Sequence, residues 1–232
     1  MAHMNDYSRE DAGQPLSLCP AYGSTVARSP RHPLVSIPQT LTETTGPADW
    51  SRLMGSAMAD LTRQHSLEPL GQRIIVSGRV LDEQHRPVPN TVVEIWQANA
   101  AGRYIHKKDQ WDAPLDPNFT GAGRAITDTE GRYRYVTVRP GAYPWKNHFN
   151  AWRPSHIHLS LLGSAFASRL VTQMYFPDDP LIEIDPIANA VPLPYRQRMV
   201  ARLDMALTQA DWALGYAFDV VLRGREATPM ET

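Results

Sequence analysis

The segment Ile74–Gln97, IIVSGRVLDEQHRPVPNTVVEIWQ, determines how the chain folds. Its first eight residues are β-branched and apolar enough for a strand, residues 82–89 have the prolines of a turn, and residues 91–97 are typical of a second strand. At least six such short strands, separated by turn residues, predict an all-β fold in the form of a two-sheet β-sandwich. The later strand-like stretches are 132–138, 156–162, 170–176 and 216–222.

The composition is that of a globular protein. The 232 residues are 42% hydrophobic and 20% charged, which is unlike a disordered chain. A net charge of −1 gives no global electrostatic reason for binding nucleic acid or an anionic membrane. The single cysteine, Cys19, excludes an internal disulfide and suits a reducing compartment. No apolar run approaches the roughly 20 residues of a membrane span, so we expect a cytoplasmic protein.

The 20 prolines predict long connections, because proline is poorly tolerated inside helices and central strands. The first 70 residues have no sustained hydrophobic period. We therefore expect residues 1–70 to form an extended N-terminal arm that packs on a partner subunit, with one short helix at Asp49–Gln64. Residues 71–232 would form the sandwich, with a second short helix at Tyr195–Leu207.

The region 141–158 contains a candidate metal site. Residues i and i+2 of a strand share a face, so His156 and His158 can converge on one point while the residue between them faces the core. Tyr143 lies in a Gly-Ala-Tyr-Pro-Trp turn and Tyr104 in a polar loop, and neither occupies a periodic core position. A His-x-His pair in a strand can also be structural, so the spacing alone leaves metal binding open.

Longer motifs around these side chains resemble those of intradiol ring-cleavage dioxygenases. They are VVEIWQANAAGRY at 92–104, LDPNF at 115–119, PGAYPW at 140–145 and WRPSHIH at 152–158. Two N-terminal runs, ARSPR at 27–31 and LVSIP at 34–38, resemble one branch of that family, in which an iron-bearing β subunit pairs with an α subunit. The resemblance covers nearly the whole chain.

The resemblance implies one non-haem Fe(III) in the domain 71–232, held by two tyrosinates and two histidines. The ligands would be Tyr104, Tyr143, His156 and His158. A free phenol has a pKa of about 10, so two ionised tyrosines require a strong Lewis acid beside them. Hard phenolate oxygen favours the ferric state, whereas ferrous oxygenases typically combine two histidines with a carboxylate.

The resemblance also implies an activity. The enzyme would cleave 3,4-dihydroxybenzoate with O2 to 3-carboxy-cis,cis-muconate in the β-ketoadipate pathway, and a paralogous α subunit without iron ligands would close the substrate cavity. Tyr143 would leave the iron when substrate binds and act as a base, while Arg153 would stabilise negative charge on the ring. Gln173 would support Arg153. The other implied positions line the cavity or adjoin the iron loop: Trp145, Ile187 and Trp96.

Two positions depart from the pattern that the branch often shows. Ile105 and Lys146 both stand where arginine is common. Lysine keeps the charge but loses the planar fork of arginine, so a contact made through that fork is in doubt. Neither position is a predicted ligand, and we have no physical account of Ile105.

A zinc hydrolase is an alternative that uses only the histidines. His148, His156 and His158 could hold zinc with water as the fourth ligand. That alternative leaves both tyrosines and Arg153 without a role.

Two further alternatives concern the fold and the family. A non-catalytic β-sandwich could use Trp96, Trp145 and Trp152 as a stacking platform, because sandwiches host many functions. Within the family, a catechol or hydroxyquinol 1,2-dioxygenase is the nearest rival. Such enzymes usually have a helical N-terminal domain, which the proline-interrupted residues 1–48 do not favour.

Overall fold

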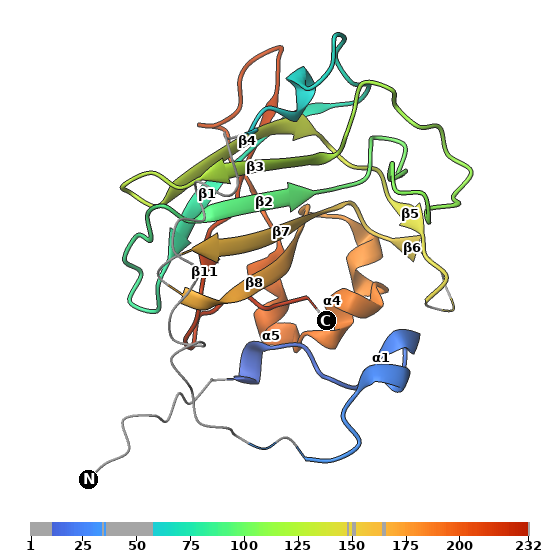
Figure 1. Ribbon diagram of the computed structural model, residues 1–232, viewed down its shortest axis with the longest axis vertical. Helices are drawn as coiled ribbons and strands as arrows, with labels where there is room; N and C mark the ends of the chain where they lie inside the picture. The colour runs from blue at the N-terminus through green and yellow to red at the C-terminus, as the bar shows by residue number, and fades with distance from the viewer. Residues whose placement is uncertain are drawn as a thin grey trace.

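The computed structural model describes residues 11–33, 35, 58–147, 149, 152–163 and 166–231. Their strands form two main sheets and one short hairpin (Figure 1), which confirms the predicted two-sheet, all-β fold class. The strands are β1 (Arg73–Leu81), β2 (Val92–Trp96), β3 (Ala122–Ile126), β4 (Arg132–Val138), β5 (Tyr143–Pro144), β6 (Trp152–Arg153), β7 (His156–Gly163), β8 (Phe166–Tyr175), β9 (Arg202–Leu203), β10 (Leu214–Ala217) and β11 (Val220–Val221).

The first sheet is built around β1. β4 pairs antiparallel with one edge of β1, β10 and then β11 pair parallel with the other edge, and β9 pairs with β10. Gly78 lies where β10 gives way to β11, and a Cβ added there would stand 1.8 Å from the carbonyl oxygen of Phe218. The backbones approach each other this closely only because the residue is glycine. The predicted strand 216–222 is therefore divided into two.

The second sheet has the strand order β3-β2-β7-β8 and supplies the rigid part of the candidate site. The alternate apolar residues of β7 are buried in the core, so His156 and His158 lie on the opposite face. In the antiparallel register, His158 is paired with Trp96 on β2 and with Gln173 on β8, and His156 is paired with Tyr175 on β8.

Tyr135 of β4 joins the two sheets through the core. Its side chain is fully buried, and its hydroxyl donates to the carbonyl of Val93 and accepts from the N–H of Ala125 at 2.8 Å. Both hydrogen-bonding roles of this phenol are thus satisfied. Other large core side chains come from both sheets: Ile74, Val80, Ile95, Leu159, Leu161 and Phe176.

The helices are all short: α1 (Gly23–Arg28), α4 (Pro186–Ala190), α5 (Leu193–Arg196), and the 3-10 turns η1 (Asp11–Gly13), η2 (Leu61–Arg63), η3 (Pro180–Glu183) and η4 (Gln197–Met199). The prediction of one helix over Tyr195–Leu207 is wrong. The helical turns end at Met199, and β9 then pairs with β10. The backbone N–H and C=O groups that a longer helix would use are therefore bonded within the sheet. No helix among the described residues is long and apolar enough to cross a membrane.

The helix predicted at Asp49–Gln64 lies partly outside the described residues, which resume at Met58. Within the described part the prediction is wrong. Met58 exchanges two backbone hydrogen bonds with Arg124 of β3, at 2.9 and 3.1 Å, and Asp60 forms a bridge to β4. Pairing with these two strands replaces local helical bonds, and only the turn η2 follows.

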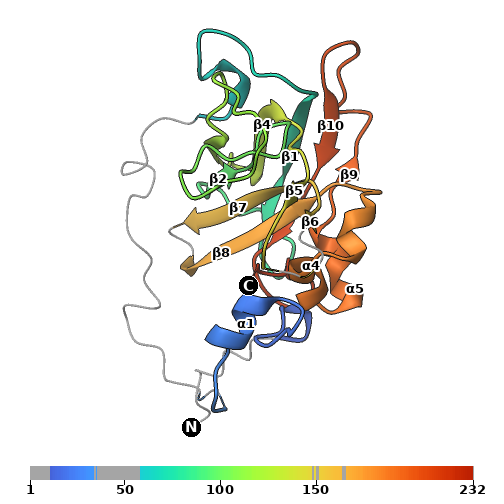
Figure 2. The ribbon, with the colours of Figure 1, turned by 90° about the vertical axis from the view of Figure 1, so that its right-hand side faces the viewer.

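The N-terminal segment 11–33 lies beside α4, α5 and the C-terminal residues (Figure 2). The N–H of Leu16 donates to the carbonyl of Ala190 at 2.8 Å, and the N–H of Met230 donates to Gln14 Oε1 at 3.0 Å. This segment therefore packs against the elements that carry the site, although the predicted boundary near residue 70 stays a prediction.

Candidate active site

The hairpin β5–β6 and the strand β7 bring three of the predicted donors together. Tyr143 on β5 is paired with Arg153 on β6, and the next strand begins at His156. The Tyr143 hydroxyl lies 3.4 Å from His156 Nε2, and the rings of His156 and His158 are 4.9 Å apart. Two imidazoles and a phenol thus face one region, as the spacing of the sequence predicts.

The fourth donor, Tyr104, arrives on the loop that follows β2. The side-chain oxygen of Asn99 accepts from two backbone N–H groups of this loop, each at 2.9 Å, and fixes its turn. Gly102 has a φ of +79°, and a Cβ there would stand 2.2 Å from the carbonyl oxygen of Ala142. Glycine therefore lets the loop lie against the Tyr143 turn, and the Tyr104 and Tyr143 rings meet edge to face at 5.4 Å.

The surroundings of the two phenols favour their protonated form. The Tyr104 hydroxyl oxygen is buried and makes no hydrogen bond of normal length and angle. A buried hydroxyl left unsatisfied ordinarily costs about 1–3 kcal/mol. Burial, followed by the neighbouring Tyr143, raises the pKa of Tyr104 well above 10. Burial also raises the pKa of Tyr143, although the Arg153 charge opposes that rise. Without a metal ion, both phenols therefore keep their protons at neutral pH.

The two histidines each have one nitrogen committed to the protein. His156 Nδ1 lies 2.7 Å from the carbonyl oxygen of Pro154, and His158 Nδ1 lies 2.8 Å from Glu231 Oε2. A carbonyl and a carboxylate can only accept, so both Nδ1 atoms carry the proton and both Nε2 atoms are available to a metal. Burial, followed by the charges of Arg153 and His158, lowers the pKa of His156 well below its ordinary value, which keeps that imidazole neutral.

This donor set fits a ferric ion. It offers two phenol oxygens, which are hard donors once ionised, and the Nε2 atoms of two imidazoles. The buried Tyr104 hydroxyl has no hydrogen bond of normal geometry, and a metal ion would give it a partner. Among the described residues no cluster of three or more His, Cys, Asp or Glu side chains is placed to hold a metal. His148, which the zinc alternative requires, lies outside the described residues.

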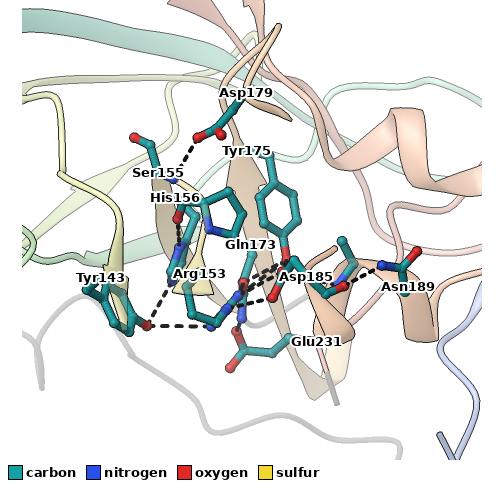
Figure 3. Close-up of polar contacts among 12 residues, drawn as sticks. Tyr143, Arg153, Ser155, His156, Gln173, Tyr175, Asp179, Asp185, Asn189 and Glu231 are labelled. Carbon is teal, nitrogen blue, oxygen red and sulfur yellow. Dashed lines mark hydrogen bonds and ion pairs between the residues drawn. The ribbon is translucent and has the colours of Figure 1, made fainter. Parts of the chain in front are cut away.

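Arg153 is buried beside the donors and carries the charge of the site (Figure 3). Its Nε donates to Asp185 Oδ1 at 2.8 Å, and its Nη1 lies 3.5 Å from the Tyr143 hydroxyl. Its Nη2 donates to Gln173 Oε1. Burial lowers the pKa of Arg153, but Asp185, Tyr175 and Tyr143 together outweigh burial and raise the pKa, so the guanidinium stays charged. Gln173 thus lies where the sequence places it, next to Arg153.

Sequence reasoning missed Asp185 and Tyr175. Asp185 is fully buried, accepts from the Tyr175 hydroxyl at 2.8 Å, and caps α4 by accepting from the N–H of Ala188 at 3.3 Å. Asp followed by Pro186 is a helix-start signature, so the cap could have been found from the sequence. The ion pair with Arg153, 32 residues away in the chain, has no such signal.

Glu231 is the third missed residue. It accepts from His158 Nδ1 and from Gln173 Nε2, at 2.8 and 2.9 Å. Burial raises the pKa of Glu231, but the bonds to His158 and Gln173 outweigh burial and hold the pKa below its ordinary value. No motif in the sequence pointed to this residue.

The structure places the predicted aromatic residues around the same site. Trp96 stacks on His158, with ring centroids 4.8 Å apart and planes 6° from parallel. Trp145 contacts the Arg153 guanidinium, whose Cζ is 5.3 Å from its ring centroid, and also the Tyr22 ring, whose centroid is 5.1 Å away. Ile187 is buried in α4, and its contact with substrate stays a prediction.

The tryptophans of the binding-module alternative do not share a platform. Trp152 pairs with Trp111 at 6.0 Å, whereas Trp96 and Trp145 each have another partner. No ring contact joins any two of Trp96, Trp145 and Trp152, all of which the structure describes. Their positions therefore give no support to a stacking surface.

Comparison with known proteins agrees with this geometry. A family model described as "Dioxygenase" matches residues 44–224, and one described as "Protocatechuate 3,4-dioxygenase beta subunit N terminal" matches residues 7–40. The protocatechuate 3,4-dioxygenase beta chain of Burkholderia cepacia is 55% identical over 96% of this chain and 96% of its own length. The protocatechuate 3,4-dioxygenase alpha chain of Pseudomonas putida is 27% identical over 84% of this chain and 97% of its own length.

Solved structures show the same fold. The 3-chlorocatechol 1,2-dioxygenase of Rhodococcus opacus superposes with a TM-score of 0.56 and 25% identity, over 72% of this chain and 65% of that one. The hydroxyquinol 1,2-dioxygenase of Pseudomonas putida superposes with a TM-score of 0.54 and 24% identity, over 71% of this chain and 59% of that one. With the family models and the beta chain, these findings lead to one conclusion: the chain belongs to the intradiol ring-cleavage dioxygenases, a family of oxidoreductases, and is similar over nearly its whole length to a beta chain of protocatechuate 3,4-dioxygenase.

Proposed function

We propose that the chain catalyses the Fe(III)-dependent intradiol cleavage of protocatechuate (3,4-dihydroxybenzoate) by O2 to 3-carboxy-cis,cis-muconate, a step of the β-ketoadipate pathway. One observation carries the proposal: two phenol oxygens and two imidazole nitrogens converge beside a buried arginine. Identity of 55% to a beta chain with that substrate in its name supports the choice of protocatechuate.

The iron would be held by Tyr104, Tyr143, His156 and His158. When bound, ferric iron would supply a Lewis acid that keeps the phenols ionised and draws electron density from a chelated catecholate ring. The protein's part is to hold the ligands in a fixed arrangement. β7 fixes both histidines, and the Asn99 turn and Gly102 bring the Tyr104 loop to them.

Tyr143 is the donor best placed to exchange a proton with substrate. Its hydroxyl is 3.5 Å from Arg153 Nη1 and 3.4 Å from His156 Nε2, so the fixed positive charge of Arg153 would stabilise a Tyr143 phenolate. We infer that the Tyr143 phenolate accepts the proton of a substrate hydroxyl. The proton then rests on a phenol whose pKa burial already raises.

Arg153 would stabilise negative charge that develops on the ring of the substrate. Its guanidinium is fixed by Asp185 and Gln173, so little reorganisation is needed when the charge appears. Trp145, whose ring lies against the guanidinium, would form one wall of the substrate cavity. Trp96 would keep the His158 ring in place by stacking on it. Ile187 on α4 would form a second wall.

We further propose that the chain assembles with a paralogous α subunit into a hetero-oligomer. The similarity to proteins named as the beta and alpha chains of one enzyme supports this partner. Expressed alone, the chain should be poorly soluble or inactive. A soluble and fully active homo-oligomer would contradict the proposal.

The test of the activity is a staged turnover. Protocatechuate is added without O2 to the purified complex, O2 is then admitted, and visible spectra and the product are recorded. We expect a coloured resting protein, a spectral change on adding substrate, and 3-carboxy-cis,cis-muconate only after O2. Catechol and hydroxyquinol serve as competing substrates, and a preference for either would favour the related 1,2-dioxygenase activity. A colourless protein that binds zinc and hydrolyses a substrate would refute the proposal.

A further inference from the structure

We propose that Glu231 is a positioning residue for the ligand His158, and that the C-terminal segment 227–231 thereby completes the metal centre. This inference rests on the proposed function, because it concerns the site of the proposed iron. It assigns a task to a carboxylate that neither the motifs nor the proposed chemistry use.

The geometry fixes one tautomer and one orientation of the imidazole. Glu231 Oε2 lies 2.8 Å from His158 Nδ1, and the carboxylate can only accept, so the proton is held on Nδ1. Nε2 is then the nitrogen left for a metal. Trp96, stacked on the His158 ring, restricts tilting, while Glu231 restricts rotation within the ring plane. A carboxylate behind a metal-binding histidine commonly supports ligation in this way.

The segment that carries Glu231 is itself fixed to the sheets. Thr228 exchanges two hydrogen bonds with Val221 of β11, at 2.9 and 3.0 Å. The hydroxyl of Thr172 on β8 donates to the carbonyl of Pro229 at 2.7 Å, and the N–H of Glu231 donates to β8 at 2.9 Å. The carboxylate is therefore presented by a pinned backbone.

Gln173 links Glu231 to Arg153 through two hydrogen bonds. The amide oxygen of Gln173 accepts from Arg153, and its NH2 group donates to Glu231 at 2.9 Å. One continuous chain of hydrogen bonds thus runs from Asp185 through Arg153 and Gln173 to Glu231 and His158 (Figure 3 shows all of it except His158). Removing the Glu231 carboxylate leaves two donors without an acceptor, one of them on a ligand.

The same stretch of chain supplies a matched control. Glu226 also pairs with a histidine, with its Oε2 2.7 Å from His85 Nε2, but both side chains are more than half exposed. Glu226 makes no hydrogen bond or ion pair with a described residue of the site. Glu226→Ala therefore removes a carboxylate–histidine contact from this C-terminal region without altering the proposed centre.

The experiment compares Glu231→Ala, Glu231→Gln and Glu226→Ala with the wild-type chain, each coexpressed with the proposed α partner. Iron per complex, the rate of iron release to a ferric chelator, and the visible tyrosinate band are measured, together with circular dichroism of the iron-free protein. We expect iron to be held about 10–100-fold less tightly by Glu231→Ala. Glu231→Gln should recover part of the loss, because its amide oxygen still accepts. Glu226→Ala should stay within about twofold of wild type, since surface pairs contribute little.

Wild-type iron retention and an unchanged visible band in folded Glu231→Ala would overturn the inference. If circular dichroism shows that Glu231→Ala does not fold, Glu231→Gln decides by the same measurements, and wild-type behaviour of that variant overturns the inference too. A wild-type complex that takes up no ferric ion overturns the proposed function together with this inference. Iron held equally by wild type and by both Glu231 variants refutes the inference alone.

Discussion

Replacing Asp185 with alanine should be among the most destabilising single changes in the chain. Asp185 is fully buried and neutralises Arg153, which is itself only 2% exposed. Breaking a buried ion pair by removing one partner costs about 3–5 kcal/mol, because the remaining charge has no compensation. The substitution also removes the acceptor of the Tyr175 hydroxyl and the cap of α4, so we expect a loss at the upper end of that range.

The loss can be measured by chemical denaturation of the purified protein, followed by intrinsic fluorescence and extrapolated to zero denaturant. In a thermal scan a loss of about 5 kcal/mol corresponds to a fall of roughly 10–20 °C, at about 2–4 °C per kcal/mol for a chain of this size. Asp179→Ala is the matched control. Asp179 caps η3 and accepts from the N–H of Ser155 at 2.9 Å, but it makes no ion pair with a described residue, so its loss should be about 1 kcal/mol.

A second substitution tests whether the unpaired charge is the cause. Arg153→Met in the Asp185→Ala background removes the buried positive charge that Asp185→Ala leaves without a compensating carboxylate. The double variant should therefore be more stable than Asp185→Ala alone. Equal losses for Asp185→Ala and the Asp179 control, or a double variant that loses still more stability, would refute the reasoning.

Three further predictions concern the donors and the close approach of the sheets. Tyr104→Phe should leave the stability of the iron-free fold unchanged or raise it by up to about 1 kcal/mol in denaturation, because it removes a buried hydroxyl that no hydrogen bond of normal geometry satisfies. Tyr135→Phe should destabilise the fold, and a loss from both variants would contradict the assignment. Burial raises the pKa of Tyr104 and Tyr143, so binding of iron by the two phenols must release their protons. The affinity for iron, measured by calorimetry, should therefore rise with pH through the neutral range, and an affinity that does not change with pH would contradict this. Gly78→Ala should prevent folding or lower the free energy of unfolding by more than about 3 kcal/mol, because its Cβ would stand 1.8 Å from the Phe218 carbonyl oxygen. A soluble variant with wild-type thermal stability would show that the strands can separate there.

The sequence predicts most of the sandwich because its central strands are rich in β-branched and aromatic residues. It misses β3, whose residues Ala122–Ile126 include alanine, glycine and arginine and show no strong strand pattern. The residues of Tyr195–Leu207 have helical spacing, yet sheet pairing at β9 prevails over it. In both cases the outcome depends on a partner strand elsewhere in the chain, which a local pattern does not contain.

The same distinction separates the donors from the groups that hold them. His156 and His158 follow from the two-residue period of a strand, and the surrounding motifs point to Tyr104 and Tyr143. The contact of His158 with Glu231 joins residues 73 positions apart, and no periodicity or capping signal in the sequence specifies such a pairing. Long-range supporting contacts become visible only once the sheets are assembled.

The hydrogen bonds around the site link the residues that would act on the substrate to those that would hold the metal. Gln173 on β8 hydrogen-bonds both to Arg153, which would face the substrate, and to Glu231, which holds His158. A change at Gln173 should therefore disturb substrate charge stabilisation and metal ligation together. The Trp145 ring lies over the Arg153 guanidinium and makes no ring contact with His156 or His158, so a change there should alter substrate binding with much less effect on the proposed metal. The β7–β8 pair thus forms the rigid part of the candidate site, and substrate specificity could vary in the surrounding loops without loss of the proposed iron ligands.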